Sequence, residues 1–540
     1  MRKKVFAPIL LIVLFCTVLV QLPLAIADRT SGYDFIDPII DIRSILVENF
    51  VREPDEEKMQ RAAIKAMIET LGDQHTIFIP PAKVRDFNKN LRGTYVGIGS
   101  EVRIIDDYLT IVSPMDDSPS LESGIRAGDV VLEIEGETTY QLPVQSCIDK
   151  LLGKPNTKVT IKVRHLDGEE EFITITRRRI TARTVKGLVR NGKDWHHCVD
   201  PENNISYVRV TQFNGSTIRE LRRTLDDLVD GGMQGLILDL RDNPGGALPA
   251  AIKMADMFLT EGVILEVRPR KVGSEKKWRS HRFGTLPDFP MIVLVNGSSA
   301  SASEIVSGAL QDNDRAKVLG TRSFGKGSVQ EVRELDFNRG TLKYTNAYYY
   351  LPSGRNLNRD RKSEETVWGV DPSPGLVITE ADEAYVERIL ARRPYEVIKD
   401  FDETLATCLD IDWIQENIKD IQLATAIEVL AKRITDHEWI EVNDIDPAVA
   451  AIDVELKRLT QARSRMIRQL EQIDERLQTR KNMAVVTGRE PLLPEDVELI
   501  AGTITLRDKD GNVIGKFRID GGDLELALNS VQLTPLKQEE

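Results

Sequence analysis

The spacing of apolar residues between positions 200 and 380 switches repeatedly between two periods. Apolar runs predict buried strands at Met291–Val295 and at Leu236–Leu240, where only Asp239 interrupts the run. Apolar residues three and four positions apart predict helices over Thr217–Val229 and Leu248–Leu259. Strands that alternate with helices in this way are typical of a layered α/β domain.

Other stretches follow different patterns. Residues from about Tyr33 to Asn90 are predicted to be helical, with one helix from Ile39 and another over Met59–Leu71. From Tyr95 to about Ile180, short alternating runs predict strands around one helix. Beyond residue 380 the pattern is mostly helical again, so the chain combines several kinds of domain.

A heptad pattern marks the C-terminal third. Apolar residues alternate at spacings of four and three, interrupted only by Arg463: Ile445, Val449, Ile452, Leu456, Leu459, Met466, Leu470, Ile473 and Leu477. This spacing is typical of a coiled coil that joins two copies, or of a helix packed on its own neighbours. Farther on, Thr503–Leu506 and Val513–Ile519 flank Asp508–Asn512, which predicts a β-hairpin.

Length, charge and cysteine content limit the possible domain number and exclude some classes of function. The chain of 540 residues is long enough for three or four domains. Its net charge of −13, with no offsetting basic stripe, argues against nucleic-acid binding. After the leader, the cysteines Cys147, Cys198 and Cys408 are too widely spaced for a disulfide framework or a metal site.

The N-terminus predicts export. Arg2-Lys3-Lys4 precedes an apolar stretch from Val5 to Val20, and Ala25-Ile26-Ala27 forms a small-x-small cleavage site. We expect cleavage after Ala27 and a periplasmic or other extracytoplasmic location. An uncleaved membrane anchor is the alternative, because the apolar stretch is nearly long enough to span a bilayer.

Candidate chemistry lies around the run Met291–Val295. A small-residue turn follows it and leads to Ser301 at the predicted start of a helix, and Lys326 comes 25 positions later between two glycines. A serine hydroxyl needs a base to become nucleophilic, and a desolvated, neutral lysine can serve as that base. Backbone N–H groups at the start of a helix can hold an oxyanion. The pattern therefore predicts acyl transfer.

Other readings of the same residues fit less well. Gly320–Lys326 matches G-x-x-x-x-G-K, but Gly327 stands where a P-loop needs Ser or Thr, and Ser328–Leu335 alternates like a strand. The small residues around Ser301 would, on their own, indicate close packing. No serine has the G-x-S-x-G pattern of a Ser-His-Asp hydrolase of the α/β type.

Three motifs together resemble the carboxyl-terminal processing peptidases, which are tail-specific serine/lysine proteases. They are Ser299–Glu304 (SASASE), Phe324–Gln330 (FGKGSVQ) and Asp239–Gly246 (DLRDNPGG). The resemblance implies a crotonase-like, ClpP-like catalytic core that needs no metal or organic cofactor. It implies that Ser301 is the nucleophile, Lys326 the general base and Gln330 the residue that positions the lysine. The oxyanion hole would comprise Gly245 or Gly246 with Ala302.

Two further stretches resemble parts of the same family. The strands between residues 93 and 182 resemble a PDZ domain whose carboxylate-binding loop would be Tyr95, Val96, Gly97, Ile98 and Gly99. Such a domain would capture C-terminal tails, or serve only as a gate or spacer. Leu71–Thr76 resembles the element L-x-D-P-H-[ST], with Gln74 at the proline position, and implies a structural role for His75.

The predicted architecture is therefore multidomain α/β. It comprises a signal peptide (1–27), a helical region (28–92), a PDZ domain (93–182), a serine/lysine peptidase core (183–380), a helical extension with the heptad segment (381–490) and a β-hairpin region (491–540). The expected function is an exported serine endopeptidase that cuts proteins at or near their C-terminal tails, and that forms homo-oligomers if the heptads pair. A catalytically silent peptide-binding scaffold is the alternative from another class, and a tricorn-like or retinoid-binding relative is a third.

Overall fold

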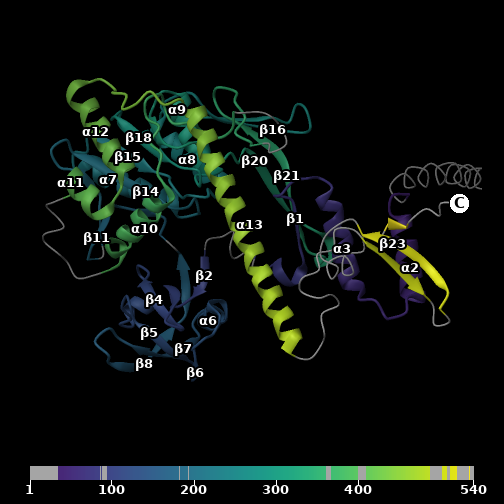
Figure 1. The fold of residues 1–540 in the computed structure, drawn as a ribbon. Helices are drawn as coiled ribbons and strands as arrows, with labels where there is room; N and C mark the ends of the chain where they lie inside the picture. Colours follow the sequence, from purple (N-terminus) through teal and green to yellow (C-terminus); the bar gives the residue numbers. More distant parts are fainter. Residues whose placement is uncertain are drawn as a thin grey trace, which may run out of the picture. The chain divides into compact units, whose positions relative to one another are not determined.

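The computed structural model describes residues 34–84, 87, 94–181, 183–192, 194–359, 367–398, 409–486, 502–507, 511–519 and 534–535 (Figure 1). The chain divides into two compact units, Met1–Ile452 and Asp453–Glu540. The predicted signal peptide and its cleavage site lie outside the described residues. Within the ranges given above, no helix is long and apolar enough to cross a membrane.

A largely parallel sheet forms the centre of the first unit. Its strand order is β10-β14-β15-β18-β19, and β14, β15, β18 and β19 are parallel. Every residue of β15 and β18 is buried, as expected for a parallel sheet covered on both faces. The bounds are β10 Val185–Lys186, β13 Cys198–Asp200 (which pairs with β14), β14 Ile205–Val210, β15 Gly235–Asp239, β18 Met291–Val295 and β19 Lys317–Gly320.

Helices cover the two faces of this sheet. Leu236 and Leu238 of β15 pack in one hydrophobic cluster with α7 (Thr217–Asp230), α8 (Leu248–Phe258) and α9 (Ala302–Asp312). Ile237, between them, packs in a second cluster with α12 (Ile421–Asp436). Alternate residues of β15 therefore reach opposite helix layers. The two strands and two helices predicted for this region are confirmed to within one or two residues.

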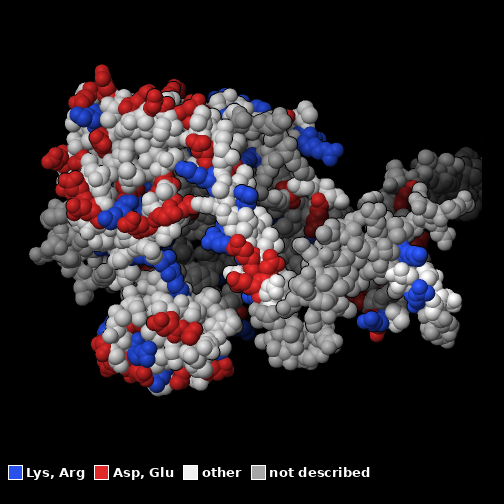
Figure 2. Space-filling view, viewed as in Figure 1, with Lys and Arg blue, Asp and Glu red and all other residues white. Residues whose placement is uncertain are grey.

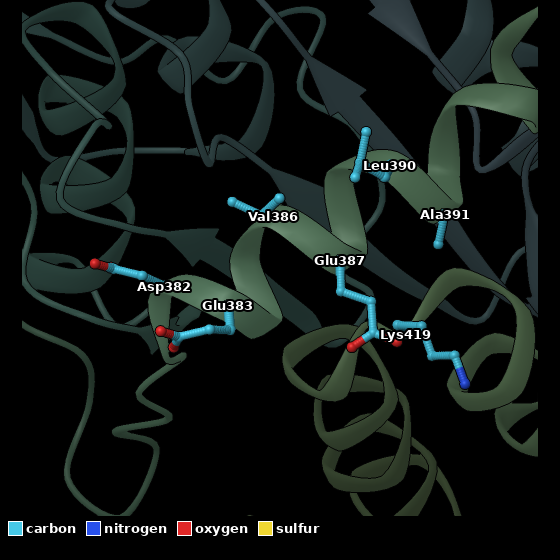
Figure 3. A pocket seen from close by; sticks show the side chains of 7 residues that line it. All are labelled: Asp382, Glu383, Val386, Glu387, Leu390, Ala391 and Lys419. Atoms are coloured by element: carbon cyan, nitrogen blue, oxygen red, sulfur yellow. The ribbon is translucent and has the colours of Figure 1, made fainter.

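The second helix layer comes from the chain beyond residue 380. It contains α10 (Asp382–Glu396), α11 (Ile411–Trp413), the π-helical turn η3 (Ile414–Ile418) and α12. The inner face of α10 carries the buried Arg388 and Arg392. Val386, Glu387 and Leu390 of this helix line an open hollow of about 610 Å³ together with Lys419, and Figure 3 shows Glu387 next to Lys419. Acidic side chains gather over this region on the face in view (Figure 2).

A second, antiparallel sheet lies next to the candidate site in the chain's first unit. Its order is β1-β21-β16-β17, and β20 also pairs with β21. The strands are β1 Ile77–Ile79, β16 Val263–Pro269, β17 Lys276–Arg279, β20 Ser328–Glu334 and β21 Thr341–Tyr350, with a 3₁₀ turn η1 over Asp336–Asn338. Helices α2 (Asp37–Asn49) and α3 (Glu56–Glu69) precede it. Helix α3 begins three residues before the predicted Met59, because the Asp55 side chain accepts the N–H of Lys58 at 2.9 Å and caps the helix there.

Residues 94–181 have a hydrophobic core of their own. The sheet order is β3-β4-β5-β7-β8, with β6 beside β5, and a separate ladder joins β2 to β9. The core cluster contains Leu109, Ile111, Val131, Val159 and Ile161. The bounds are β2 Thr94–Gly97, β3 Ser100–Ile105, β4 Tyr108–Pro114, α5 Pro119–Glu122, β5 Val130–Ile134, β6 Glu137–Thr138, α6 Val144–Leu151, β7 Lys158–Arg164, β8 Glu170–Thr176 and β9 Arg178–Thr181.

The remaining elements are a short hairpin and the C-terminal part. Strands β11 (Val189–Asn191) and β12 (Asp194–His196) pair with each other. Helix α13 runs over Pro447–Val486 and carries the heptad residues from Val449 onward. The apolar heptad side chains from Leu456 to Leu477 are about half exposed. Strands β22 (Gly502–Arg507) and β23 (Val513–Ile519) are antiparallel, and β24 (Thr534–Pro535) pairs with β23.

Candidate active site

Ser301 occupies a strained turn between β18 and α9. Its φ of 56° and ψ of −109° are unusual for a residue with a side chain, and such strain persists only where the surrounding structure imposes it. The preceding Ser299 imposes part of it, because its Oγ donates to the carbonyl of Leu240 at 2.8 Å. Ser301 is 7% exposed. The turn thus presents one serine at the start of a helix, as the sequence predicts.

The turn that follows β15 packs directly on this serine. A Cβ on Gly245 would lie 2.5 Å from the carbonyl oxygen of Ala300 and 2.9 Å from the amide nitrogen of Ala302, so only glycine fits. The N–H of Gly245 donates to the side-chain oxygen of Asn243 at 2.9 Å. The N–H groups of Gly246 and Ala302 have no acceptor in the part of the chain that the structure describes, which makes these two the better candidates for oxyanion donors.

Glu304 connects the serine turn to the loop that carries Lys326. Its Oε2 accepts the backbone N–H of Ser301 at 2.7 Å and that of Lys326 at 2.9 Å. Its Oε1 accepts the Ser323 hydroxyl and the Gly325 N–H, both at 2.6 Å. Glu304 is fully buried. One carboxylate therefore fixes the backbone of both candidate catalytic residues.

The surroundings favour a neutral lysine. Burial lowers the pKa of the Lys326 ammonium below its usual value, and the charge of Lys343 lowers it further, whereas Glu304 opposes the shift. Burial raises the pKa of the Glu304 carboxyl, and its four hydrogen-bond donors oppose that rise. All four groups donate to it, so the ionised form is the one that this arrangement satisfies.

The glycines beside Lys326 are required by close packing. Gly325 has a φ of +87°, and a Cβ there would lie 2.6 Å from the Trp368 ring. A Cβ on Gly327 would lie 2.2 Å from the amide nitrogen of Asn358. The carbonyl of Gly325 accepts the N–H of Arg359 at 2.8 Å. These contacts hold the lysine loop in one position.

Gln330 and Tyr349 lie on the neighbouring strands β20 and β21. The Gln330 amide donates to the Ser328 hydroxyl at 2.8 Å, and its amide makes no hydrogen bond with Lys326 among the described residues. Burial raises the pKa of the Tyr349 phenol, and a hydrogen bond with the Ser301 side chain partly offsets that rise. The structure thus brings Tyr349 to the serine, while the positioning role of Gln330 stays a prediction.

His75 lies beside the lysine loop, on the wall of a cavity of about 530 Å³ that Phe324, Gly325 and Thr345 also line. Its backbone N–H donates to Asp73 at 3.0 Å. Burial lowers the pKa of the His75 imidazole, and the charge of Lys326 lowers it further. These contacts anchor the turn next to the lysine, and the structural role expected for His75 stays a prediction.

The expected carboxylate-binding loop comprises the end of β2 and the two residues that connect it to β3. Tyr95, Val96 and Gly97 belong to β2, which pairs with β9. The carbonyl groups of Ile98 and Gly99 both accept N–H groups from the turn at residues 115–120. Gly99 has a φ of +79°, and a Cβ on it would lie 2.5 Å from the Ser118 Cβ. Burial raises the pKa of Tyr95 to about 12.

From the sequence, no role was assigned to Glu304 or Tyr349, although both contact the site. Glu304 had a signal, because Ser301-x-x-Glu304 is the spacing of a helix capping box, in which the acid reaches back to the N-cap N–H. Tyr349 had none. Its place depends on the pairing of β20 with β21, which shifts at a bulge between Val329 and Gln330.

Comparisons with known proteins identify the family of this chain. Residues 204–372 match the model of peptidase family S41. The carboxy-terminal-processing protease of Bartonella bacilliformis is 35% identical over 344 residues, which cover 63% of this chain and 74% of that protein. A probable CtpA-like serine protease of Staphylococcus saprophyticus is 29% identical over 380 residues, covering 68% of this chain and 74% of that protein.

Among solved structures, a photosystem II D1 C-terminal processing protease is 25% identical, with a TM-score of 0.37, and the match covers 63% of this chain and 86% of that one. The sequence relationship to the curated proteins is close enough, over enough of their length, to assign the family. The chain belongs to peptidase family S41, the serine peptidases that include the carboxy-terminal-processing proteases.

Proposed function

We propose that this chain is an exported serine endopeptidase that cleaves protein substrates at or near their C-terminal tails through a Ser301–Lys326 acyl-enzyme mechanism. The observation that carries the proposal is the shared carboxylate oxygen of Glu304, which accepts the backbone N–H groups of both residues. A nucleophile and its base must be held in fixed relative positions for efficient proton transfer. This arrangement supports such a fixed geometry.

The proposed reaction has two halves. Neutral Lys326 takes the proton of the Ser301 hydroxyl as the oxygen attacks the scissile carbonyl carbon, and the N–H groups of Gly246 and Ala302 stabilise the oxyanion that forms. When the C–N bond breaks, the lysine returns this proton to the leaving amine. Water then attacks the ester carbonyl, again with Lys326 as base, and releases the carboxylate product and free serine.

Gln330 is proposed to orient the Lys326 amine when substrate is bound. Gln330 comes four residues after Lys326, on β20, and its present partner Ser328 is the first residue of that strand. Catalytic hydrogen bonds are often formed only in the substrate complex, which is compatible with the observed geometry.

Substrate capture is proposed to involve residues 93–182. Successive N–H groups of a loop can hold a terminal carboxylate while the tail adds as a strand beside the sheet, here beside β3. The sharp backbone at Gly99 and its close approach to Ser118 support a rigid loop of this kind. Export of the mature enzyme is proposed from the leader sequence.

A homo-oligomer through α13 is part of the proposal. Six apolar side chains on its heptad positions are 48–61% exposed: Leu456, Leu459, Met466, Leu470, Ile473 and Leu477. A row of half-exposed leucines and isoleucines at this spacing favours pairing with another helix. Analytical ultracentrifugation of the wild type and of Leu470→Asp tests this pairing. If the helices pair, the molecular mass of the sedimenting particle should be lower in the variant.

The test of function is cleavage of an unfolded substrate with a free C-terminal tail. Wild-type enzyme should release tail fragments that mass spectrometry places near the C-terminus, and Ser301→Ala should release none. Ser298→Ala, in the same turn but exposed, is the matched control and should cleave normally. Wild-type protein that binds the tail without cutting it would favour the silent scaffold instead.

A further inference from the structure

Another cavity, of about 380 Å³, has a lining that does not include Ser301. It is bounded by the end of β4, by strands β10, β12 and β14, and by the inner face of α10. Its apolar wall includes Val112, Pro114, Met115, Ile389 and Val397. The rest of the lining is dominated by basic side chains.

Unsatisfied hydrogen-bond donors are concentrated in this cavity. Four buried N–H groups of its lining have no acceptor among the described residues: Trp195 Nε1, Arg209 Nε, and Nε and Nη1 of Arg392. Arg392 is 2% exposed, and only its Nη2 is satisfied by a hydrogen bond, to the Tyr207 hydroxyl at 2.7 Å. Its Nε lies 3.0 Å from Glu396 but outside hydrogen-bonding direction. Buried donors of this kind are costly unless something accepts from them.

The charge of the lining points to the same kind of ligand. Six basic residues face three acidic ones: Arg183, Lys186, Arg190, Arg209, Arg392 and Arg393 against Glu101, Asp116 and Glu396. Glu396 alone is shared by Lys186, Arg209 and Arg392. Burial alone would raise the pKa of Glu396, but Arg209 and its other cationic neighbours hold it at about 2. From outside the lining, Asp117 pairs with Arg183 and Asp239 with Arg392, which leaves the cations in excess by one.

We propose that this cavity binds a small oxyanion, a carboxylate or phosphate group, that accepts from Trp195, Arg209 and Arg392. Arginine forks match the geometry of such groups, and the apolar wall would admit a carboxylate attached to an apolar chain. The anion comes either from free inorganic phosphate or from the terminal carboxylate of a peptide. Only the peptide source rests on the proposed function, because phosphate binding requires no proteolysis.

The test is calorimetric titration of full-length Ser301→Ala protein with inorganic phosphate at constant ionic strength. We expect saturable binding that is weakened about tenfold or more by Trp195→Phe, which removes the indole N–H, and by Arg209→Lys, which removes the Nε–H together with the guanidinium fork. Trp278→Phe, on β17 and outside the cavity, is the matched control and should bind like the parent. Circular dichroism checks that the variants are folded. If Arg209→Lys does not fold, the result for Trp195→Phe decides the test.

A second titration identifies the source of the anion. An N-acetylated tripeptide of alanine and leucine is compared with its C-terminal amide on the same variants. Binding of the free acid but not the amide, weakened by Trp195→Phe, assigns the site to peptide termini, whereas binding of phosphate alone assigns it to the free ion. The proposal is overturned if neither ligand binds, or if Trp195→Phe binds both as tightly as the parent does.

Discussion

The Oε2 atom of Glu304 accepts the backbone N–H of Lys326 at 2.9 Å, across 22 positions of sequence. The same oxygen holds the N–H of Ser301, so one buried carboxylate sets the spacing of the proposed nucleophile and base. Backbone hydrogen bonds to a charged acceptor are among the stronger ones in proteins. The proposed activity should therefore depend on Glu304 even though its side chain faces neither substrate nor solvent.

Glu304→Gln should lower kcat about 10- to 100-fold with little change in KM. The amide NH₂ of glutamine would face backbone N–H groups that need an acceptor, and the two loops would shift by a fraction of an ångström. Steady-state kinetics on a tailed peptide gives both constants. Glu331→Gln, on the exposed part of β20, is the control. Unchanged kcat in Glu304→Gln would show that the carboxylate does not set the catalytic geometry.

Gly245→Ala should reduce turnover by about 100-fold or more, because the added Cβ would displace the N–H of Ala302, and the loss of an oxyanion donor has an effect of this size. The added Cβ meets the carbonyl of Ala300, which is backbone and has little room to move. Gly273→Ala is matched to it, because Gly273 also has a positive φ but has no atom near its Cβ position. That variant should show strain alone and keep the wild-type rate. Equal rates in the two variants would argue against the packing account.

Asp420→Asn should destabilise the first unit by about 3 kcal/mol, as expected when a buried ion pair loses one partner. Asp420 accepts two hydrogen bonds from Arg241 at 2.8 and 2.7 Å, and all three groups of the Asp239–Arg241–Asp420 cluster are buried. Urea unfolding measures the change. On the same helix, Asp436→Asn removes only an exposed pair with Lys432 and should cost less than about 1 kcal/mol.

The stabilisation that His165 gives to the sheet β3-β4-β5-β7-β8 should decrease as pH rises. Hydrogen bonds to Glu171 and Asp129, both at 2.8 Å, raise the pKa of the His165 imidazole above its usual value. Because the folded pKa is raised, the stabilisation is complete below about pH 6.5, the unperturbed value, and is lost as pH rises through the folded pKa.

Hydrogen exchange of amides in β7 and β8 measures this stabilisation locally. The difference in protection between wild type and His165→Gln should be largest at low pH and shrink as pH is raised. His281→Gln, at a histidine whose side chain is 77% exposed, should show no such trend. If the difference in protection between wild type and His165→Gln did not depend on pH, the charge of His165 would not be the source of the stabilisation.

The sequence predicted the parts of the site that short-range rules govern. An apolar run followed by small residues indicated the β18–α9 turn, and the flanking glycines indicated a tightly packed loop at Lys326. The domain plan itself, the PDZ resemblance and the assigned catalytic roles are still predictions. Local pattern was sufficient for the elements because buried strands and amphipathic helices have distinct periods.

The contacts that connect distant segments had no such signal. Arg241 and Asp420 are 179 positions apart, and their pairing depends on how α12 packs against the central sheet. A lone buried aspartate at a helix start is read from sequence only as a cap, which Asp420 also is, accepting the N–H of Leu423 at 2.9 Å. Pairing across the fold requires three-dimensional information.

Lys326 is proposed to act as a neutral base for Ser301, and the single-turnover cleavage rate of Lys326→Ala measures how much the reaction depends on it. Lys343→Ala is the matched control, because Lys343 is close enough to lower the pKa of Lys326 but has no proposed chemical role. We expect a loss of about 10⁴-fold or more in Lys326→Ala and a far smaller loss in Lys343→Ala, which keeps the base and removes only a neighbouring charge that lowers its pKa. A wild-type rate in Lys326→Ala would contradict the proposed role of Lys326.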